Sequence, residues 1–419
     1  MEVSKNMISK DHSLLSNIKL PTIADKTGRL IGEEELQQLR EVIESGTLAY
    51  IYGTKVYAFE KEFAELFGVK YAIAVSSGTA SLHTAMIYLN PNPGDEIIVS
   101  PITDMGSVIP ILYQQAIPVF ADIDPATQTL DPKSIEENIS NRTRGIMVTH
   151  IHGIPANMDA IMEIAKRHDL FVIEDSAQAH MSKYHGKLVG TIGDVGCFSF
   201  QQSKHITTGD GGMVISNEDM KFGRSLRHCF DKGWPRDKPG RDHYFLAPNY
   251  HMTELQAAVG IAQIKKYPES IEARRASGKA LVERLQESNL VTLLTTLPDT
   301  TSTFFSFSFM INQEKLDVTA DVLVKELYQQ GLKCEQGYPG PVPLYMYPVI
   351  REKKTFGSSG WPFTSPFARK EWSYEPGLCP KAEKACQETI VIPWNERITQ
   401  QHVDLIADTI IAILNQYRR

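Results

Sequence analysis

The feature that most restricts the fold is a series of short apolar runs that alternate with helical patterns. The runs are rich in β-branched residues and lie at 71–75, 96–99, 119–123, 145–151 and 171–174. Helical patterns at 80–88, 107–113, 132–138 and 158–167 separate most of them. Strands that alternate with helices predict βαβ crossovers and a mainly parallel sheet covered on both faces. We therefore expect a three-layer α/β domain.

The order of elements changes in the C-terminal part of the chain, and its 419 residues suffice for two domains. A helix begins at Thr253, where Thr253 and Gln256 form a capping-box pattern, and Pro268 interrupts it. Beyond lie a charged helix at 269–287, a strand at 304–311, a helix at 318–330, a strand at 390–393 and a helix at 400–417. We expect a large domain at 20–267 and a smaller α+β domain at 268–419.

Composition excludes several classes of partner. The net charge of -7 argues against nucleic acid, which needs a basic face. Five cysteines without a CxxC pair predict a reducing compartment and no zinc site or other metal site. Residues 1–20 show no apolar signal core, and no apolar run is long enough to span a membrane. A soluble cytoplasmic protein is the expectation.

The stretch at 191–217, TIGDVGCFSFQQSKHITTGDGGMVISN, places a single lysine between two strand-like runs. Lys204 stands in a polar segment without a run of other charges beside it. Partial desolvation in such a segment lowers the pKa of a lysine and frees its amine to attack a carbonyl. A solvated loop lysine is the alternative, with roughly equal weight on this segment alone.

Two further features complete a cofactor pattern. Ser76, Ser77, Gly78 and Thr79 stand where a strand turns into a helix, which is an anion site unless they serve only to cap the helix. Asp175 ends another strand at the edge where open α/β sheets bind ligands. A phosphate cradle, a carboxylate for a pyridine nitrogen and a later lysine together predict pyridoxal 5'-phosphate.

Five motifs, in this order, carry a resemblance to a known family. They are YAIAVSSGTASLHTAM, HGIPANMDAI, FVIEDSAQAH, DVGCFSFQQSKHITTGDGGMV and NYHMTELQAAVGIAQ. From about Leu30 to its C-terminus the chain resembles the DegT/DnrJ/EryC1/StrS family of pyridoxal-phosphate aminotransferases of fold type I, which act on keto-sugars and cyclitols. The segments 231–237 and 337–380 look most like the inosose aminotransferase branch.

The resemblance implies a role for each matching residue. Lys204 is similar to the Schiff-base lysine, Asp175 to the partner of the pyridine nitrogen and Gln178 to the contact of the ring hydroxyl. The residues that match phosphate contacts are Gly78, Thr79, Ser199 and Asn249. In the family the last of these reaches the phosphate from the neighbouring subunit, which implies a homodimer with shared sites. A turn residue is the alternative interpretation of Asn249.

The sequence departs from the family pattern at two places. Where the family stacks an aromatic side chain on the cofactor ring, this chain is expected to place Met105, next to an unusual Asp104. A histidine, His251, replaces an arginine in the motif NYH, which weakens or removes a positive charge near neutral pH.

The resemblance implies transamination from glutamine or glutamate to a keto group of a cyclitol or sugar, as in aminocyclitol or antibiotic biosynthesis. Nucleotide-linked keto-sugars are the alternative acceptors, and a basic cluster could hold their diphosphate, namely Arg227, Lys232, Arg236 and Lys238. A sugar dehydratase or a non-catalytic relative is less expected, because the lysine and the aspartate are both present. The aromatic-rich segment 337–380 is either a lid over the substrate or a packing element.

Overall fold

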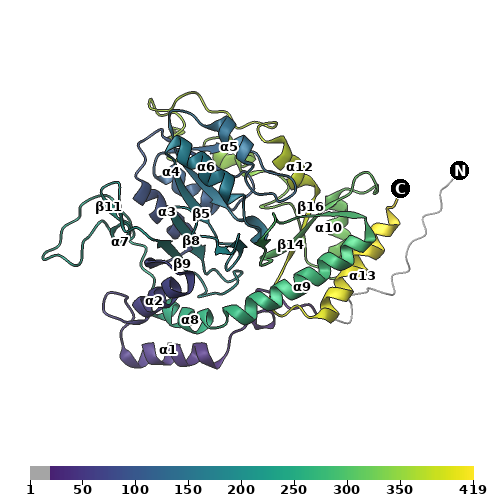
Figure 1. The fold of residues 1–419 in the computed structure, drawn as a ribbon, viewed down its shortest axis with the longest axis horizontal. Coiled ribbons are helices and arrows are strands. Elements are labelled where there is room, and N and C mark those ends of the chain that lie inside the picture. The colour runs from purple at the N-terminus through teal and green to yellow at the C-terminus, as the bar shows by residue number, and fades with distance from the viewer. Residues whose placement is uncertain (1–18) are drawn as a thin grey trace.

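The computed structural model describes residues 19–419 and contains a large and a small sheet with their helices (Figure 1). The prediction that residues 1–20 lack a signal core falls almost entirely outside this range. No helix among the described residues is long and apolar enough to cross a membrane.

The large sheet has seven strands in the order β1-β9-β8-β5-β4-β2-β3. Strand β9 is antiparallel to both of its neighbours, and the remaining neighbours pair in parallel. The strands of this sheet are β1 (Tyr71–Val75), β2 (Glu96–Val99), β3 (Ile117–Phe120), β4 (Thr143–Thr149), β5 (Phe171–Asp175), β8 (Val195–Ser199) and β9 (Gly212–Ser216).

Both faces of the large sheet are covered by helices. Every residue of β2, β5, β8 and β9 is buried, which requires cover on both faces. The covering and flanking helices are α1 (Glu33–Ser45), α2 (Lys55–Phe67), α3 (Gly78–Leu89), α4 (Ile109–Tyr113), α5 (Pro132–Asn138), α6 (Met158–His168), α7 (Leu226–Cys229) and α8 (Glu254–Ile264). The predicted three-layer, mainly parallel α/β architecture is confirmed.

A second core forms around a small antiparallel sheet, in the order β12-β14-β16-β15. Its strands are β12 (Val291–Leu293), β14 (Ser306–Ile311), β15 (Glu335–Gln336) and β16 (Thr389–Pro393), and its helices are α9 (Tyr267–Ser288), α10 (Ala320–Gln329) and α13 (Gln400–Gln416). Helix α13 packs against α9 and α10. This is the smaller α+β part expected from the sequence, and the boundary at residue 268 stays a prediction.

Short elements connect these layers. The short strands are β6 (Lys183–Tyr184), β7 (Lys187–Leu188), β10 (Met220–Lys221), β11 (Arg224–Ser225) and β13 (Thr300–Thr301). Single helical turns are η1 (Lys26–Gly28), η2 (Met105–Ser107), η3 (Ile151–Gly153) and η4 (Leu344–Met346), and two further helices are α11 (Pro348–Arg351) and α12 (Pro380–Glu388).

Two predicted boundaries differ from the structure. The strand expected at 119–123 lies at Ile117–Phe120. Beyond it the backbone pairs outside the sheet, where Ile123 forms an isolated bridge with Leu130. Pro268 does not interrupt a helix. It lies in the first turn of α9, where its missing N–H costs nothing.

The segment between β15 and β16 leaves the small sheet and covers the edge of the large one. Buried aromatic residues of this segment, including Tyr345, Trp372 and Tyr374, belong to the same core as the large sheet. The Tyr374 hydroxyl donates a hydrogen bond to the carbonyl oxygen of Pro118 in the edge strand β3, at 2.9 Å. The segment therefore closes an edge that would otherwise expose unpaired backbone groups.

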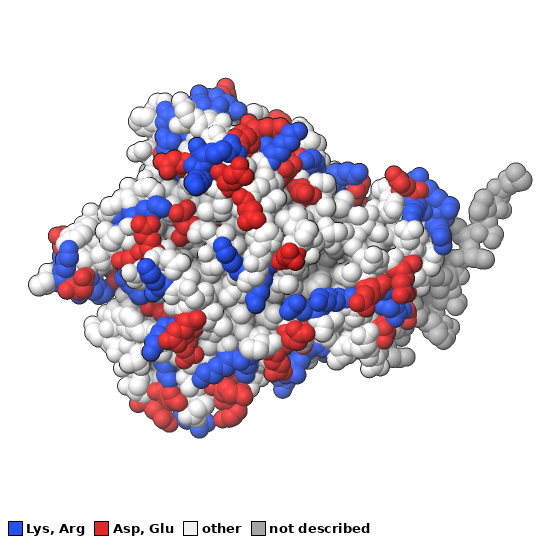
Figure 2. All heavy atoms as spheres, in the orientation of Figure 1, with Lys and Arg blue, Asp and Glu red and all other residues white. Residues whose placement is uncertain are grey.

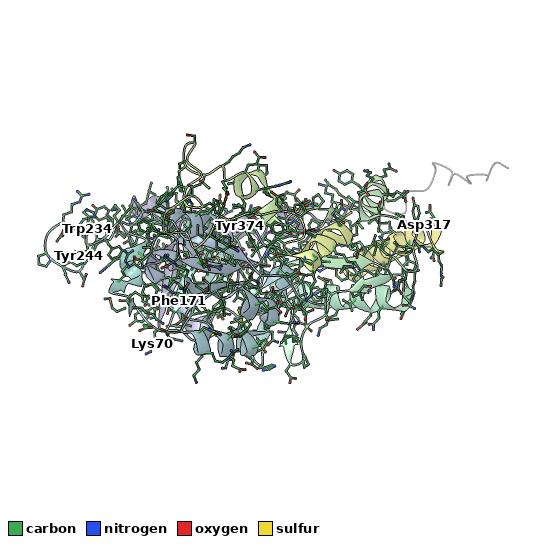
Figure 3. The ribbon with its side chains drawn as sticks, turned by 90° about the horizontal axis from the view of Figure 1, so that it is seen from above. Lys70, Phe171, Trp234, Tyr244, Asp317 and Tyr374 are labelled. Carbon is green, nitrogen blue, oxygen red and sulfur yellow. The ribbon has the colours of Figure 1, made fainter. Side chains whose placement is uncertain are left out.

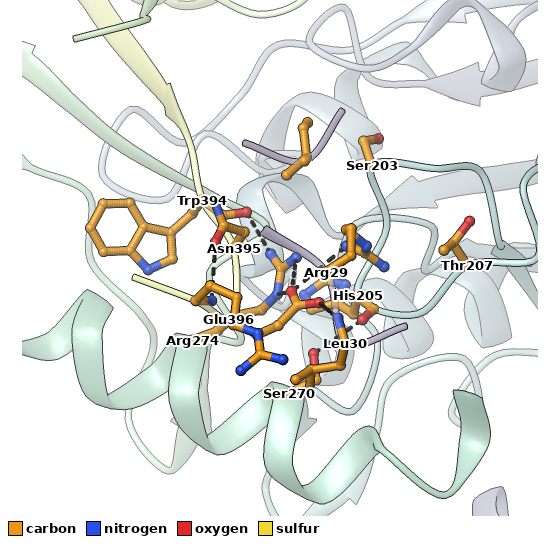
Figure 4. Close-up of polar contacts among 12 residues, drawn as sticks. Arg29, Leu30, Ser203, His205, Thr207, Ser270, Arg274, Trp394, Asn395 and Glu396 are labelled. Carbon is orange, nitrogen blue, oxygen red and sulfur yellow. Dashed lines mark hydrogen bonds and ion pairs between the residues drawn. The ribbon is translucent and has the colours of Figure 1, made fainter. Parts of the chain in front are cut away.

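A buried ion pair joins α9 to the chain beyond β16 (Figure 4). Arg274 donates two hydrogen bonds to one carboxylate oxygen of Glu396, at 3.1 and 2.9 Å, and a third to the carbonyl oxygen of Trp394 at 2.8 Å. The Arg274 side chain is fully buried. Arg29 contributes a second buried guanidinium, 3.7 Å from Glu396.

We predict that Arg274→Met lowers the free energy of unfolding by about 3 to 5 kcal/mol, because Glu396 loses its best partner while it stays buried. Arg284→Met on the same helix is the matched control. Arg284 pairs with Asp404 and Asp408 at a partly exposed position, so the loss should be at most about 1 kcal/mol. Urea unfolding followed by circular dichroism measures both, and equal losses would contradict the role given to Arg274.

Candidate active site

The ends of several strands of the large sheet meet at one edge. Strands β1, β2, β5 and β8 run in the same direction, so the segments that follow them lie together. A cavity of about 540 Å³ opens at this edge, and residues from both sheets line it. Of the predicted site residues, five line this cavity, namely Gly78, Thr79, Asp175, Ser199 and Lys204.

The first turn of α3 forms a cradle at one side of the cavity. Ser77 caps the helix and accepts a hydrogen bond from the N–H of Ala80 at 3.0 Å. A Cβ atom on Gly78 would lie 2.5 Å from the Cβ of Ser199, so only glycine allows β8 to approach the helix this closely. The amide groups of Gly78 and Thr79 precede the first intrahelical hydrogen bond and suit an anion.

A buried carboxylate lies at the end of β5. The Asp175 carboxylate accepts hydrogen bonds from the Ser107 hydroxyl at 2.7 Å and from the N–H of Ala177 at 3.1 Å. Burial raises the pKa of Asp175 above its ordinary value, while these hydrogen bonds and the charge of Lys204 oppose the rise. The carboxylate is thus held in one orientation, and no basic side chain among residues 19–419 forms a salt bridge with it.

Lys204 stands in a turn after β8, where its N–H donates a hydrogen bond to the carbonyl oxygen of Gln201 at 2.9 Å. Its Nζ lies 4.5 Å from the ring centre of Phe305, a residue of the small domain. Burial lowers the pKa of Lys204, and the charges of Asp175 and Asp104 partly oppose this. The lowered pKa increases the share of neutral amine at neutral pH, which is the nucleophilic and basic form.

The histidine next to the lysine points away from the cavity. His205 is buried and stacks on His180, with ring centres 5.1 Å apart. Burial lowers the pKa of both imidazoles well below the usual value. Lysine, not histidine, therefore faces the cavity at this position.

Three predicted residues do not line the cavity. Gln178 is buried beside it and accepts a hydrogen bond from the N–H of His152 at 3.1 Å. Met105 packs partly buried against the large core, whereas its neighbour Asp104 lines the cavity. Asn249 is exposed and accepts a hydrogen bond from the N–H of His251 at 3.2 Å. The ring-stacking role given to Met105 thus remains a prediction that this arrangement does not favour.

The residues that sequence reasoning missed come from distant segments. Ser107 orients Asp175, Phe305 precedes strand β14 of the small sheet and lines the cavity, and Tyr338 lines it from the segment 337–380. Burial raises the pKa of Tyr338, so its phenol stays protonated. Nothing in the local sequence marks these three residues. Among residues 19–419 no cluster of histidine, cysteine and carboxylate side chains is arranged to hold a metal ion.

Most of the basic cluster near residue 231 is already paired. Arg227 forms a salt bridge with Glu60 at 2.8 Å. Arg236 and Lys232 both pair with Asp231, which also lies 2.8 Å from His251. Burial alone would raise the pKa of Asp231, but hydrogen bonds from these partners hold it below its ordinary value. On the face shown in Figure 2, basic and acidic side chains are likewise interspersed.

The aromatic-rich segment 337–380 contributes little to the cavity. Of its residues only Tyr338 is among those that line it. Tyr345, Trp372 and Tyr374 pack in the large core instead. The contacts therefore favour the packing interpretation over a lid.

Comparison with known proteins places these features in a family. Residues 29–411 match the DegT/DnrJ/EryC1/StrS aminotransferase family. The chain is 36% identical over 317 residues to GDP-perosamine synthase of Caulobacter vibrioides, covering 75% of this chain and 84% of the relative. It is 39% identical over 262 residues to a putative L-glutamine:3-amino-2,3-dideoxy-scyllo-inosose aminotransferase of Micromonospora echinospora, covering 61% and 62% of the two chains.

A solved structure supports the same assignment. The aminotransferase from Psychrobacter cryohalolentis superposes with a TM-score of 0.83 and 27% identity, covering 93% of this chain and 98% of that one. The family match spans nearly the whole chain and agrees with the cradle, the carboxylate and the lysine found at the sheet edge. The chain belongs to the DegT/DnrJ/EryC1/StrS family and is a pyridoxal-phosphate-dependent aminotransferase.

Proposed function

We propose that the protein transfers an amino group from glutamine or glutamate to the keto group of a free cyclitol or small sugar, in aminocyclitol or amino-sugar biosynthesis. The observation that carries the proposal is that Asp175, Lys204 and the first turn of α3 share one cavity. The relative named for an amino-inosose supports the acceptor class. The five buried, unpaired cysteines support a cytoplasmic location.

The residues present fit pyridoxal phosphate. Gly78, Thr79 and Ser199 form the cradle in which the phosphate would lie, because the glycine leaves room and the helix terminus favours an anion. Gln178 would reach the ring oxygen with its amide NH₂, since its oxygen already accepts from the N–H of His152. When bound, the cofactor supplies an electron sink for the carbon that loses its proton.

Asp175 and Lys204 have different roles in the proposed proton transfers. The Asp175 carboxylate, oriented by Ser107, would keep a proton on the pyridine nitrogen. Lys204 would hold the cofactor through its Nζ. Once released, its amine would take the proton from the α-carbon of the donor in the first half-reaction and would deliver a proton to the keto carbon of the acceptor in the second. Its lowered pKa suits this base role near neutral pH.

Charge in the cavity favours a free acceptor over a nucleotide-linked one. Lys204 is the single cation among the lining residues of the described chain, and the carboxylates beside it are Asp104, Asp175, Asp210 and Glu335. A diphosphate is usually held by arginine or lysine. Because Arg227, Arg236 and Lys232 are paired with acids, they are poor candidates for that task. The alternative, a nucleotide-linked keto-sugar, is supported by the similarity to GDP-perosamine synthase.

We predict that scyllo-inosose reacts with a kcat/KM at least about tenfold above that of GDP-4-keto-6-deoxymannose, a difference of roughly 1.4 kcal/mol. Turnover should depend weakly on ionic strength, because no charge pair forms with the acceptor. Initial rates with glutamine as donor measure both. Lys238→Gln, at an exposed position of the basic cluster, should leave the rates unchanged. A preference for the nucleotide-linked sugar that is lost in salt or in Lys238→Gln would overturn the acceptor class.

The active unit is proposed to be a homodimer with shared sites. Asn249 is exposed and does not line the cavity of its own chain, which leaves it available to a second copy. The preceding loop projects from the large domain and carries Trp234 and Tyr244 (Figure 3). Leu246 on this loop is 93% exposed, which is costly for a leucine unless another surface covers it.

Mixing two inactive variants tests the shared site. In a heterodimer of Lys204→Ala and Asn249→Ala, one site has both residues intact and the other has neither. After subunit exchange of an equal mixture, activity should recover to about a quarter of the wild-type value, because half of the dimers carry one intact site of two. The absence of recovery, with exchange verified by mass spectrometry, would leave Asn249 as a turn residue.

A further inference from the structure

A second cavity, of about 670 Å³, lies between α9 and the segment 291–308. Its volume is within the range of small-molecule sites. Ser306, the first residue of β14, lines both this cavity and the one that contains Lys204. The second cavity is therefore adjacent to the candidate active site, but its lining includes neither Lys204 nor Asp175.

Strand β14 presents a buried hydroxyl face to this cavity. Phe307 and Phe309 alternate with Ser306 and Ser308 along the strand, and the two phenylalanines pack in the small core. Both serines are buried and line the second cavity. Hydrogen bonds within the chain offset the cost of burying these hydroxyl groups, and each hydroxyl oxygen can form more than one such bond.

A buried histidine holds this hydroxyl face in place. His152 Nδ1 lies 2.8 Å from the Ser306 hydroxyl and 3.2 Å from that of Ser308. Its backbone is in the left-handed region, with φ of 57°, a conformation that histidine adopts more readily than most other residues. Burial lowers the pKa of His152 to about 3, so the ring is neutral near pH 7. The backbone N–H of His152 donates a hydrogen bond to the side-chain oxygen of Gln178. His152 therefore links the hydroxyl face of β14 to the residue that is predicted to contact the cofactor.

The opposite wall carries positive charge. Arg275 and Lys279 lie one turn apart on α9, and both line the cavity. The Nε of Arg275 is buried and has no hydrogen-bond partner among residues 19–419. Glu283, a further turn along, is the one acidic side chain among the lining residues of the described chain. Arg275 also lies 3.7 Å from the carboxylate of Glu272 outside the lining. Its Nε and the ammonium group of Lys279, which forms no salt bridge among the described residues, are left to meet a ligand.

We propose that this cavity binds a small polyhydroxylated anion, of the class of sugar phosphates and sugar acids. Arg275 and Lys279 would hold the phosphate or carboxylate, since both anions form charge-assisted hydrogen bonds with such cations. The hydroxyl groups of the ligand would meet those of Ser306, Ser308, Thr300 and Thr301 across the cavity. The proposal does not depend on which acceptor the enzyme aminates.

Isothermal titration calorimetry on the holoenzyme tests the proposal with four probes, namely glucose 6-phosphate, gluconate, glucose and inorganic phosphate. We expect one or both of the polyhydroxylated anions to bind at least tenfold more tightly than glucose or inorganic phosphate. Binding of glucose 6-phosphate or of gluconate would show whether the site takes a phosphate or a carboxylate. The double variant Arg275→Gln/Lys279→Gln should weaken that binding at least tenfold. Lys325→Gln should not, because Lys325 lies on α10 outside the cavity and pairs with Asp321.

Three results would overturn the proposal. If neither polyhydroxylated anion bound, the cavity would not be a binding site of the proposed kind. Equal affinity for inorganic phosphate would show that the hydroxyl wall contributes nothing. If the double variant bound the polyhydroxylated anion with unchanged affinity, the anion would bind at another site, for example in the Lys204 cavity. Retained visible absorbance of the bound cofactor in the double variant verifies that the protein is folded and loaded.

Discussion

A buried carboxylate and a lysine of lowered pKa share one cavity, and much of the fold serves to hold them there. Removing either charge from water is costly, and a buried charge persists only when partners stabilise it. Asp175 is stabilised by Ser107 and the N–H of Ala177, and Lys204 by the charges of Asp175 and Asp104. The parallel strands deliver these groups to the same edge, and Phe305 of the small domain covers the lysine. The two domains are thereby coupled at the site.

Much of this arrangement could be predicted from the sequence because it is encoded locally. The continuous apolar runs predicted the bounds that strands β1 and β2 have in the structure. The serine, glycine and threonine residues after β1 indicated the cradle. The motif order indicated Asp175 and Lys204. Contacts made across long sequence separations were not predictable in this way. Ser107 was assigned to a helix, and nothing around Phe305 or Tyr338 distinguishes them from core residues.

The segment 337–380 could likewise not be interpreted from its sequence alone. Its aromatic residues suit a sugar-binding lid and a packed core equally well, because both environments favour large rings with a polar edge. Whether the segment is a lid or a packing element depends on which surface it contacts. Hydrogen bonds from the Tyr374 hydroxyl to Pro118 and from the N–H of Leu344 to Pro101 direct it to the edge of the large sheet. Composition alone carries no such information.

The central proposal is that Lys204 is the residue to which the cofactor is bound. Borohydride reduction of the holoenzyme fixes the cofactor to its lysine, and peptide mass mapping then identifies that residue. The account predicts a single phosphopyridoxyl group on the peptide that contains Lys204, and none on the exposed Lys187. A group on any other lysine, or an unmodified Lys204 in protein that holds the cofactor, would contradict it.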